Sequence, residues 1–458
     1  MEMDGWLSLS FLALLTILVI WLLKLSVGKS KPAGKQLAPG PWTLPIIGSL
    51  HHVAGALPHR ALMHLSRRHG QLMHLMLGEV PVVVVSSPEA ATLVMKTNDL
   101  AFTGRPCGVT LDIFSSGGRG IAFAPNGDHL RQMRKVCVME LLSSTQVKRM
   151  EGIRAEEVGS LLRDITDAAS TGAGHAINVS EKVMALSNGV VTRAVFGGKF
   201  SQQGEYLCEL GKAIKLLGGF CLVDLFPSSS LVRWLSSGER QMKKSCGHMQ
   251  RIISEIIDEC KATRAAQADD EDLLDVLLRL QKEDSLEFPL TTETICAVLF
   301  DMFAGATETT STTLAWAMSE LGRSPEIMAK AQQEVWEVLG EGQSVITNND
   351  LVKLHYMQMV IKETLRLHPP ISLIPRSARE DCTFMGYDIL KGTNIYINAF
   401  AISQDPKNWD NPREFRPERF ENINLNYNGT NFEFIPFGAG RRQCPRIQFA
   451  SSVVEMWH

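Results

Sequence analysis

The segment from Pro436 to Arg446 (PFGAGRRQCPR) has the residue types and spacing best suited to chemistry. The segment matches the first four fixed positions of the pattern F-x-x-G-x-R-x-C-x-G, with Phe437, Gly440, Arg442 and Cys444. Glycine lets a backbone turn tightly against a flat ligand, and backbone N–H groups can stabilise a thiolate. An arginine two residues before the cysteine can pair with a carboxylate on that ligand. The pattern predicts a loop that presents the Cys444 thiolate to a metal; the alternative is an ordinary surface loop.

A polar cluster interrupts the long apolar segment Thr291–Gly322. It runs from Gly305 to Thr313 (GATETTSTT) and contains Glu308 and Thr309. Threonines can bend a helix through hydrogen bonds to its carbonyls, and a buried carboxylate needs a partner or a shifted pKa. A carboxyl beside a hydroxyl is suited to proton transfer. We interpret the cluster as a proton-transfer site inside a core helix, with a solvent-exposed polar face as the alternative.

A third motif combines Glu363 and Arg366, which are three residues apart and so share one helical face. Alone, such a pair would be an ordinary surface ion pair. The sequence Pro417-Glu418-Arg419-Phe420 follows downstream and supplies a second arginine, Arg419. The combination predicts a structural contact between these two segments.

In their order along the chain, these motifs resemble those of the cytochrome P-450 superfamily, in which a cysteine thiolate is the axial ligand of haem iron. The chain looks most similar to the plant microsomal members of specialised metabolism. The resemblance covers nearly the whole chain, from its N-terminal segment to Cys444. It implies that Cys444 binds the iron of haem b. It also implies a set of cofactor-binding residues: Arg134, Arg376, Phe437, Gly440, Arg442 and Cys444.

By the same resemblance, Thr309 donates a hydrogen bond to dioxygen and Glu308 relays protons to it, so these two are the expected catalytic residues. Glu363, Arg366 and Arg419 would form the buried triad of the family, with a structural role.

Three positions depart from the family pattern: Leu130 replaces a tryptophan, Ala306 a glycine and Arg446 the final glycine. Overpacking by a longer side chain commonly costs ~1–3 kcal/mol, although a long cation can also extend to the surface. After Cys444, family members continue through a helix and a terminal hairpin, whereas 14 residues remain here. The resemblance therefore implies a C-terminally truncated member, and an inactive or unstable haem-binding protein is one alternative.

The N-terminal segment Trp6–Leu23 has no charged residue and is roughly 27 Å long as a helix, enough to span a hydrocarbon core. Acidic residues precede it and Lys24 follows it, which favours a cytoplasmic location for the rest of the chain. A cleaved signal peptide is the alternative. The predicted organisation is a lumenal end (1–5), a transmembrane anchor (6–23), a basic, proline-rich hinge (24–48) and a monooxygenase domain (49–458). The expected location is the endoplasmic reticulum membrane.

Hydrophobic periodicity predicts a mostly α, α-rich α+β fold with a small β-sheet region. One hairpin is predicted at Gln71–Leu77 and Val80–Ser86, and a second at Cys382–Leu390 and Thr393–Ala399. Residues 404–435 are predicted to be ordered coil. The predicted helices are Asp128–Leu142, Ile153–Ala168, Gln241–Ala265, Leu273–Gln281, Thr291–Gly322, Pro325–Leu339 and Asn348–His368.

Composition narrows the function further. The net charge of −3 argues against a nucleic-acid partner, and nine scattered cysteines favour reduced thiols over a disulfide framework or zinc site. The family resemblance implies insertion of one oxygen atom from O₂ into a small apolar substrate, terpenoid- or phenylpropanoid-like. Electrons would come from NADPH through NADPH–cytochrome P-450 reductase, with cytochrome b5 as a second partner. A haem-thiolate hydroperoxide isomerase is the other enzyme alternative, and Glu308 and Thr309 argue against it.

Substrate contacts are the least specified feature of the sequence. Phe200–Leu235 is interpreted as an irregular apolar segment at the mouth of a channel near the bilayer. Pro106–Ser116 would overlie the haem in the family fold.

Overall fold

The structure is a computed structural model that describes residues 16, 34–140, 150–170, 176–218, 221–263, 272–283, 286–340, 348–423, 425–445 and 447. Apart from Thr16, the predicted anchor at 6–23 lies outside the described residues, and so does Arg446. Within the described part of the chain, no helix has both the length and the apolar character needed to cross a membrane.

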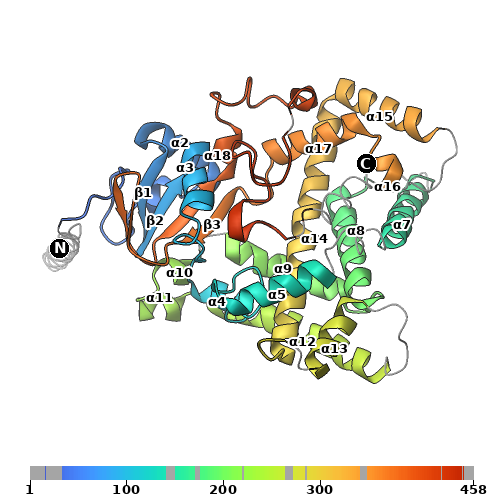
Figure 1. Cartoon of the computed structure of the whole chain (residues 1–458), viewed down its shortest axis with the longest axis horizontal. Helices are drawn as coiled ribbons and strands as arrows, with labels where there is room; N and C mark the ends of the chain where they lie inside the picture. Colours follow the sequence, from blue (N-terminus) through green and yellow to red (C-terminus); the bar gives the residue numbers. More distant parts are fainter. Residues whose placement is uncertain are drawn as a thin grey trace, which may run out of the picture.

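A four-stranded sheet lies to one side of a larger helical region (Figure 1). Its strand order is β1 (Leu72–Leu77), β2 (Val80–Val85), β6 (Asn394–Asn398) and β3 (Leu373–Ser377). β1 and β2 form the predicted first hairpin, β6 joins β2 in parallel, and β3 pairs antiparallel with β6. The first hairpin is therefore confirmed.

The second predicted hairpin is wrong in its pairing. β4 (Cys382–Phe384) and β5 (Tyr387–Ile389) form a short hairpin of their own around Met385-Gly386, where φ is 53° and 83°. Two successive positive φ angles make a tight two-residue turn. β6 leaves that hairpin and pairs with β2 and β3, because this buries Ile395 and Ile397 completely within the larger sheet.

Helices contain most of the described residues, with short helical turns at η1 (Leu50–His52), η2 (Leu93–Thr97), η3 (Pro417–Phe420) and η4 (Gly440–Arg442). The helices before the central segment are α2 (Pro58–His69), α3 (Pro88–Thr92), α4 (Val109–Phe114), α5 (Asp128–Glu140), α7 (Glu151–Ser170), α8 (Val179–Phe196), α9 (Gln203–Gly218), α10 (Leu222–Leu225), α11 (Ser230–Leu235), α12 (Gly238–Thr263) and α13 (Leu273–Glu283). The remaining helices are α14 (Thr292–Arg323), α15 (Pro325–Leu339), α16 (Asn348–Leu351), α17 (His355–Leu367) and α18 (Ala399–Ser403).

The predicted helix Asn348–His368 is in fact two helices, α16 and α17, separated by a turn at 352–354. The segment Phe200–Leu235, interpreted as irregular, contains α9, α10 and α11. The prediction also omitted α8, which is buried around most of its circumference. A helix buried on nearly all sides has no polar stripe, so its 3.6-residue period is weak.

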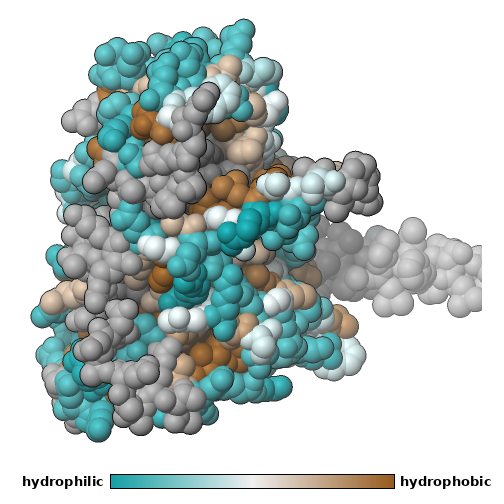
Figure 2. All heavy atoms as spheres, turned by 90° about the vertical axis from the view of Figure 1, so that its right-hand side faces the viewer, coloured by the Kyte–Doolittle hydropathy of each residue, from teal (hydrophilic) through white to brown (hydrophobic). Residues whose placement is uncertain are grey.

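α14 is the central helix of the helical region (Figure 1) and packs against α8 and α17. It begins after Thr291, whose hydroxyl accepts a hydrogen bond from the Thr294 N–H, as a helix N-cap does. On the face that includes α7 and α15, the residues shown in colour are mostly hydrophilic, with separated apolar areas (Figure 2). Among the described residues, one large apolar cluster lies along α14, and two smaller clusters include the strands of the sheet.

Candidate active site

The cysteine loop is held in a turn by its glycines. The Cys444 N–H donates to the Phe437 carbonyl at 3.0 Å, and Gly438 and Gly440 both have a φ of +68°. A Cβ atom at Gly440 would lie 2.0 Å from the carbonyl oxygen of Met95, so only glycine fits there. The Cys444 residue is partly exposed rather than buried.

Two predicted arginines, Arg134 and Arg376, bind this loop from other elements, and a third, Arg442, is part of it. Arg134 on α5 donates to the Gln443 carbonyl at 2.9 Å, and Arg376 on β3 donates to the Ala439 carbonyl at 2.8 Å. Burial lowers the pKa of Arg134, and the neighbouring Cys444 opposes that shift. The structure therefore brings Arg134 and Arg376 to the same loop as Cys444.

Arg442 faces the interior from within the loop. Its guanidinium donates to the carbonyls of Ala124 at 2.6 Å and Thr103 at 3.0 Å. Burial, together with the neighbouring Arg376 and Arg134, lowers its pKa to about 10.

A fourth arginine of this cluster, Arg105, is partly buried and was not predicted from the sequence. It donates to the carbonyls of Ala122 at 2.9 Å and Pro375 at 2.6 Å. Burial of its guanidinium lowers the pKa of Arg105 well below the usual value. The positive charges of Arg442, Arg376 and Arg134 lower it further. No periodic or motif signal in Gly104-Arg105-Pro106 distinguishes this arginine from a solvated one.

These cations fit a ligand that carries carboxylates. Among the described residues, Arg376 Nε and Arg442 Nη1 are buried without a hydrogen-bond partner. A buried donor without a partner costs ~1–3 kcal/mol, and mutual repulsion of buried guanidiniums adds to that cost. A ligand with carboxylates beside Cys444 would satisfy both needs. The two propionates of haem have this chemistry, so the residues present fit haem.

The middle of α14 combines exposed and buried residues within a few positions. Gly305 is exposed and Glu308 and Thr309 are partly exposed, although most neighbouring residues of the helix are buried. The Thr309 hydroxyl donates to the Gly305 carbonyl at 2.6 Å, and the Thr313 hydroxyl donates to the Thr309 carbonyl at 2.9 Å. Bonds of this kind tend to bend a helix.

Glu308 is the acid of this region. Its Oε2 atom is buried and has no hydrogen-bond partner among the described residues. Burial raises the pKa of its carboxyl group. A carboxyl that keeps its proton to a higher pH is suited to act as a proton donor.

Asp301, one helical turn before Gly305, connects α14 to the segment 120–124. Its Oδ2 accepts hydrogen bonds from the N–H groups of Ile121 at 2.6 Å and Ala122 at 2.9 Å. A Cβ atom at Gly120 would lie 2.0 Å from the same oxygen. Since Arg105 donates to the Ala122 carbonyl, this segment joins the helix to the arginine cluster.

The predicted triad is formed and fully buried. Glu363 accepts two hydrogen bonds from Arg366, at 2.7 and 2.8 Å, and one from Arg419 at 2.9 Å. Arg366 also donates to the carbonyls of Ser403 and Pro412. The triad therefore fixes the coil that precedes the cysteine loop and has no reacting partner of its own.

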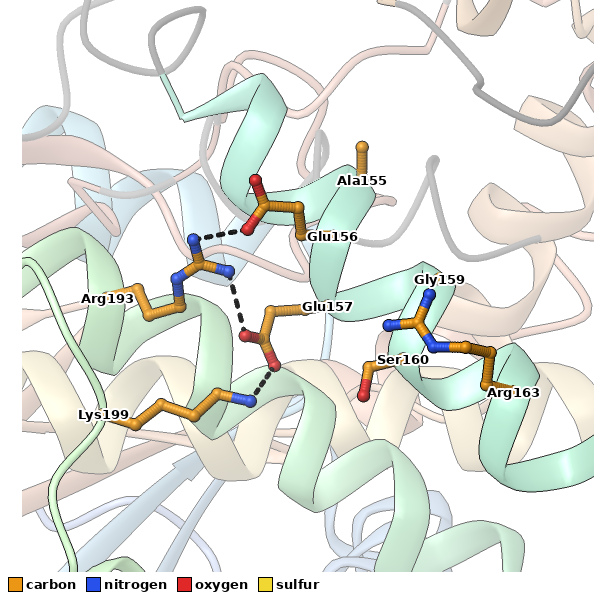
Figure 3. A pocket seen from close by; sticks show the side chains of 8 residues that line it. All are labelled: Ala155, Glu156, Glu157, Gly159, Ser160, Arg163, Arg193 and Lys199. Carbon is orange, nitrogen blue, oxygen red and sulfur yellow. Dashed lines mark hydrogen bonds and ion pairs between the residues drawn. The ribbon is translucent and has the colours of Figure 1, made fainter. Parts of the chain in front are cut away.

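A separate surface pocket lies between α7 and the end of α8 (Figure 3). Glu157 pairs with Arg193 at 3.2 Å and with Lys199 at 2.7 Å, and Arg193 also pairs with Glu156 at 2.6 Å. These charges neutralise one another. We assign the network to packing α7 against α8.

The family of the chain is shown by comparison with known proteins. The family model described as Cytochrome P450 matches residues 38–456. The chain is 44% identical over 451 residues to a desmethyl-deoxy-podophyllotoxin synthase from Sinopodophyllum hexandrum, an alignment that covers 97% of this chain and 87% of the relative. It is 44% identical to an ent-cassadiene hydroxylase from Oryza sativa subsp. japonica, covering 96% and 87%. It is 42% identical to a premnaspirodiene oxygenase from Hyoscyamus muticus, covering 96% and 86%.

The fold comparison agrees. A solved structure of a zebra fish cytochrome P450 with progesterone superposes with a TM-score of 0.76 at 26% identity, covering 88% of this chain and 91% of the other. The chain belongs to the cytochrome P450 family and is an oxidoreductase that incorporates oxygen. Its similarity to plant enzymes of specialised metabolism confirms the resemblance drawn from the motifs.

Proposed function

We propose that this chain is a haem-thiolate monooxygenase that hydroxylates a small apolar, terpenoid-like substrate. The observation that carries the proposal is the glycine-turned loop of Cys444 with a cluster of four arginines, of which Arg376 and Arg442 are buried and Arg105 and Arg134 are partly buried. The reaction is RH + O₂ + NADPH + H⁺ → ROH + H₂O + NADP⁺. One oxygen atom enters the C–H bond and the other leaves as water, with both electrons supplied by NADPH.

Haem b would supply the activation of dioxygen, with the Cys444 thiolate as the ligand of its iron. Phe437 and Gly440 shape the loop around that thiolate, and the arginine cluster holds the carboxylates of the cofactor. Burial raises the pKa of Glu308 and so favours the protonated form of its carboxyl group, which suits a proton donor. Thr309, one residue on, offers a hydroxyl that can exchange its Gly305 acceptor for a substrate-side partner.

An apolar substrate suits the aromatic residues beside this region. The Phe114 ring lies 4.8 Å from the Phe300 ring and 6.2 Å from the Phe123 ring, between centroids. α4, which carries Phe114, occupies much of the segment Pro106–Ser116 expected near the haem. Several relatives bear names of terpene oxidations, such as ent-cassadiene hydroxylase and premnaspirodiene oxygenase. The phenylpropanoid-like alternative is supported by the relative named desmethyl-deoxy-podophyllotoxin synthase.

A membrane location is part of the proposal, with 6–23 as the anchor, 24–48 as the hinge and 49–458 as the cytoplasmic catalytic body at the endoplasmic reticulum. Large apolar side chains are exposed near the β1–β2 hairpin: Trp42, Ile46, Leu231, Trp234 and Leu235. Their segments approach the hairpin through the Gly48–Leu77 bridge and the Glu79 N–H to Leu225 carbonyl bond. This apolar surface suits contact with lipid. NADPH–cytochrome P-450 reductase, and cytochrome b5 as a second donor, are the proposed electron partners.

The test is the absorption spectrum of the reduced, carbon-monoxide-bound protein, for the chain and for Cys444→Ser. We expect the long-wavelength Soret band of thiolate ligation in the chain and its loss in the variant. Cys107→Ser removes an exposed thiol and serves as the matched control. A band that survives in Cys444→Ser contradicts the ligand assignment. Turnover of ent-cassadiene only with NADPH and reductase supports the monooxygenase, whereas rearrangement of a lipid hydroperoxide without NADPH supports the isomerase.

A further inference from the structure

We propose that Asn188 is a positioning residue that sets the orientation of α14 where that helix carries Glu308 and Thr309. Asn188 lies on α8 and is fully buried, as is Thr307 on α14. The Asn188 Nδ2 donates to the Thr307 hydroxyl at 3.1 Å. Thr307 directly precedes Glu308, so the bond acts at the turn that carries the proposed proton donor. Only the catalytic consequence of this inference rests on the proposed function.

The two faces of α14 explain how such a bond can act at a distance. Thr307 is two residues from Gly305 and therefore lies roughly 200° around the helix from it. Phe303 shares the buried face of Thr307, whereas Thr309 shares the opposite face with the exposed Gly305. A fixed position for Thr307 thus fixes the rotation of the opposite face.

Asn188 is itself fixed by two further hydrogen bonds. Its Oδ1 accepts from Gln203 Nε2 at 2.7 Å and from the Thr192 hydroxyl at 3.4 Å. Gln203 begins α9, so the amide joins three helices at one point. A buried amide is costly unless its atoms are bonded, and a satisfied polar group in a core favours one arrangement over its neighbours.

α8 is supported on another side by the network of Figure 3. A Cβ atom at Gly189, the residue after Asn188, would lie 2.5 Å from Glu157 Oε2. Glu157 in turn pairs with Arg193 of α8. Close contact with α7 holds α8 in place, and α8 can therefore act as the fixed support for α14.

Aromatic contacts of Phe303 also lie on this face of α14. The Phe303 ring lies 5.1 Å from the Phe196 ring and 5.5 Å from the Tyr206 ring. Apolar contacts are non-directional and tolerate a small rotation of the helix, whereas a hydrogen bond depends on angle and distance. The bond from Asn188 therefore supplies the directional constraint at this position.

The experiment compares Asn188→Leu with the double variant Asn188→Leu/Thr307→Val. The single variant leaves the buried Thr307 hydroxyl without its donor, and this can unfold the protein. The double variant replaces this bonded pair by apolar groups, a change that can be nearly neutral for stability. In both variants the partly exposed Gln203 amide can bond to water, and the Thr192 hydroxyl can donate to the backbone carbonyl of residue 188. Ser187→Ala is the matched control, because Ser187 is buried on α8 and its hydroxyl has no hydrogen-bond partner among the described residues.

Two quantities are measured on full-length, haem-loaded protein with an unchanged melting temperature. Hydrogen exchange of the peptide 303–311 should be ~tenfold faster in the double variant, equivalent to ~1.4 kcal/mol of local opening, and unchanged in Ser187→Ala. With NADPH, reductase and ent-cassadiene as the probe, the share of electrons released as hydrogen peroxide should rise about threefold or more, since proton delivery from Glu308 is misdirected.

If the peptide 303–311 exchanges hydrogen at the same rate in the double variant as in wild type, the positioning role of Asn188 is overturned. Faster exchange with an unchanged peroxide share would overturn its link to proton delivery. If the unmodified chain consumes no NADPH, the proposed function fails, and the exchange measurement still decides whether Asn188 positions α14.

Discussion

Asp301 on α14 accepts a hydrogen bond of 2.6 Å from the backbone N–H of Ile121, and this bond joins two parts of the chain 180 residues apart. The same carboxylate oxygen accepts the N–H of Ala122. The segment that supplies these donors also supplies the carbonyls of Ala122 and Ala124 to Arg105 and Arg442 of the arginine cluster. The central helix and the arginine cluster are therefore connected through one short loop.

Asp301→Asn should weaken this connection, because an amide oxygen is a weaker acceptor than a carboxylate for two N–H groups. We expect a loss of ~1–3 kcal/mol in the free energy of unfolding and a broader range of product isomers, measured by denaturant titration and product analysis. Glu293→Gln changes an exposed carboxylate at the start of the same helix and is the control. Equal effects of the two variants would contradict a role for the Asp301 contact.

Glu363→Gln should destabilise the protein strongly, because it leaves two buried guanidiniums without their carboxylate. Breaking a buried ion pair in this way costs ~3–5 kcal/mol. Differential scanning calorimetry of the haem-loaded protein measures the effect. Asp164→Asn removes an exposed partner of Lys182 and should leave the melting temperature unchanged. An unchanged melting temperature for Glu363→Gln as well would show that the triad does not hold the coil.

Glu308→Gln should alter how stability depends on pH. Burial raises the pKa of Glu308 above its ordinary value of 4.5, so the folded protein binds more protons at this group than the unfolded chain does. The contribution of Glu308 to the free energy of unfolding is therefore at its full value below pH 4.5. It is lost as the pH rises through the raised pKa of the folded state. We therefore expect wild type to lose stability relative to Glu308→Gln over that interval, as measured by urea unfolding at a series of pH values. Parallel pH profiles would refute a raised pKa at Glu308.

Arg105→Met should speed the loss of haem from the protein. The proposed hydrogen bond from Arg105 to a haem carboxylate would be charge-assisted and worth ~1.5 kcal/mol. Its loss corresponds to about a tenfold faster release of haem. Transfer of haem to apomyoglobin measures the rate. Arg379→Met, at an exposed arginine two residues after Ser377, is the control and should release haem at the wild-type rate. If Arg105→Met matches this control, Arg105 does not bind the cofactor.

The local sequence determined those features that depend on neighbouring residues. Glycines at 438 and 440 specify the turn before Cys444, because both have a positive φ that other residues rarely adopt. Two apolar runs around Gly78-Glu79 specify the first hairpin, and the spacing of Glu363 and Arg366 places both on one helical face. Each of these signals is a preference of a few consecutive residues.

Tertiary structure alone decided which distant residues meet. β6 pairs with β2, more than 300 residues earlier in the chain, rather than with the nearby strands β4 and β5. The reason is that the larger sheet buries more apolar surface. Arg105 and Asn188 have no local pattern that marks them. A buried arginine and a solvated one have the same backbone preferences, and a core amide differs from a surface amide only in its distant neighbours. Their roles follow from burial and from hydrogen bonds between segments that the fold brings together.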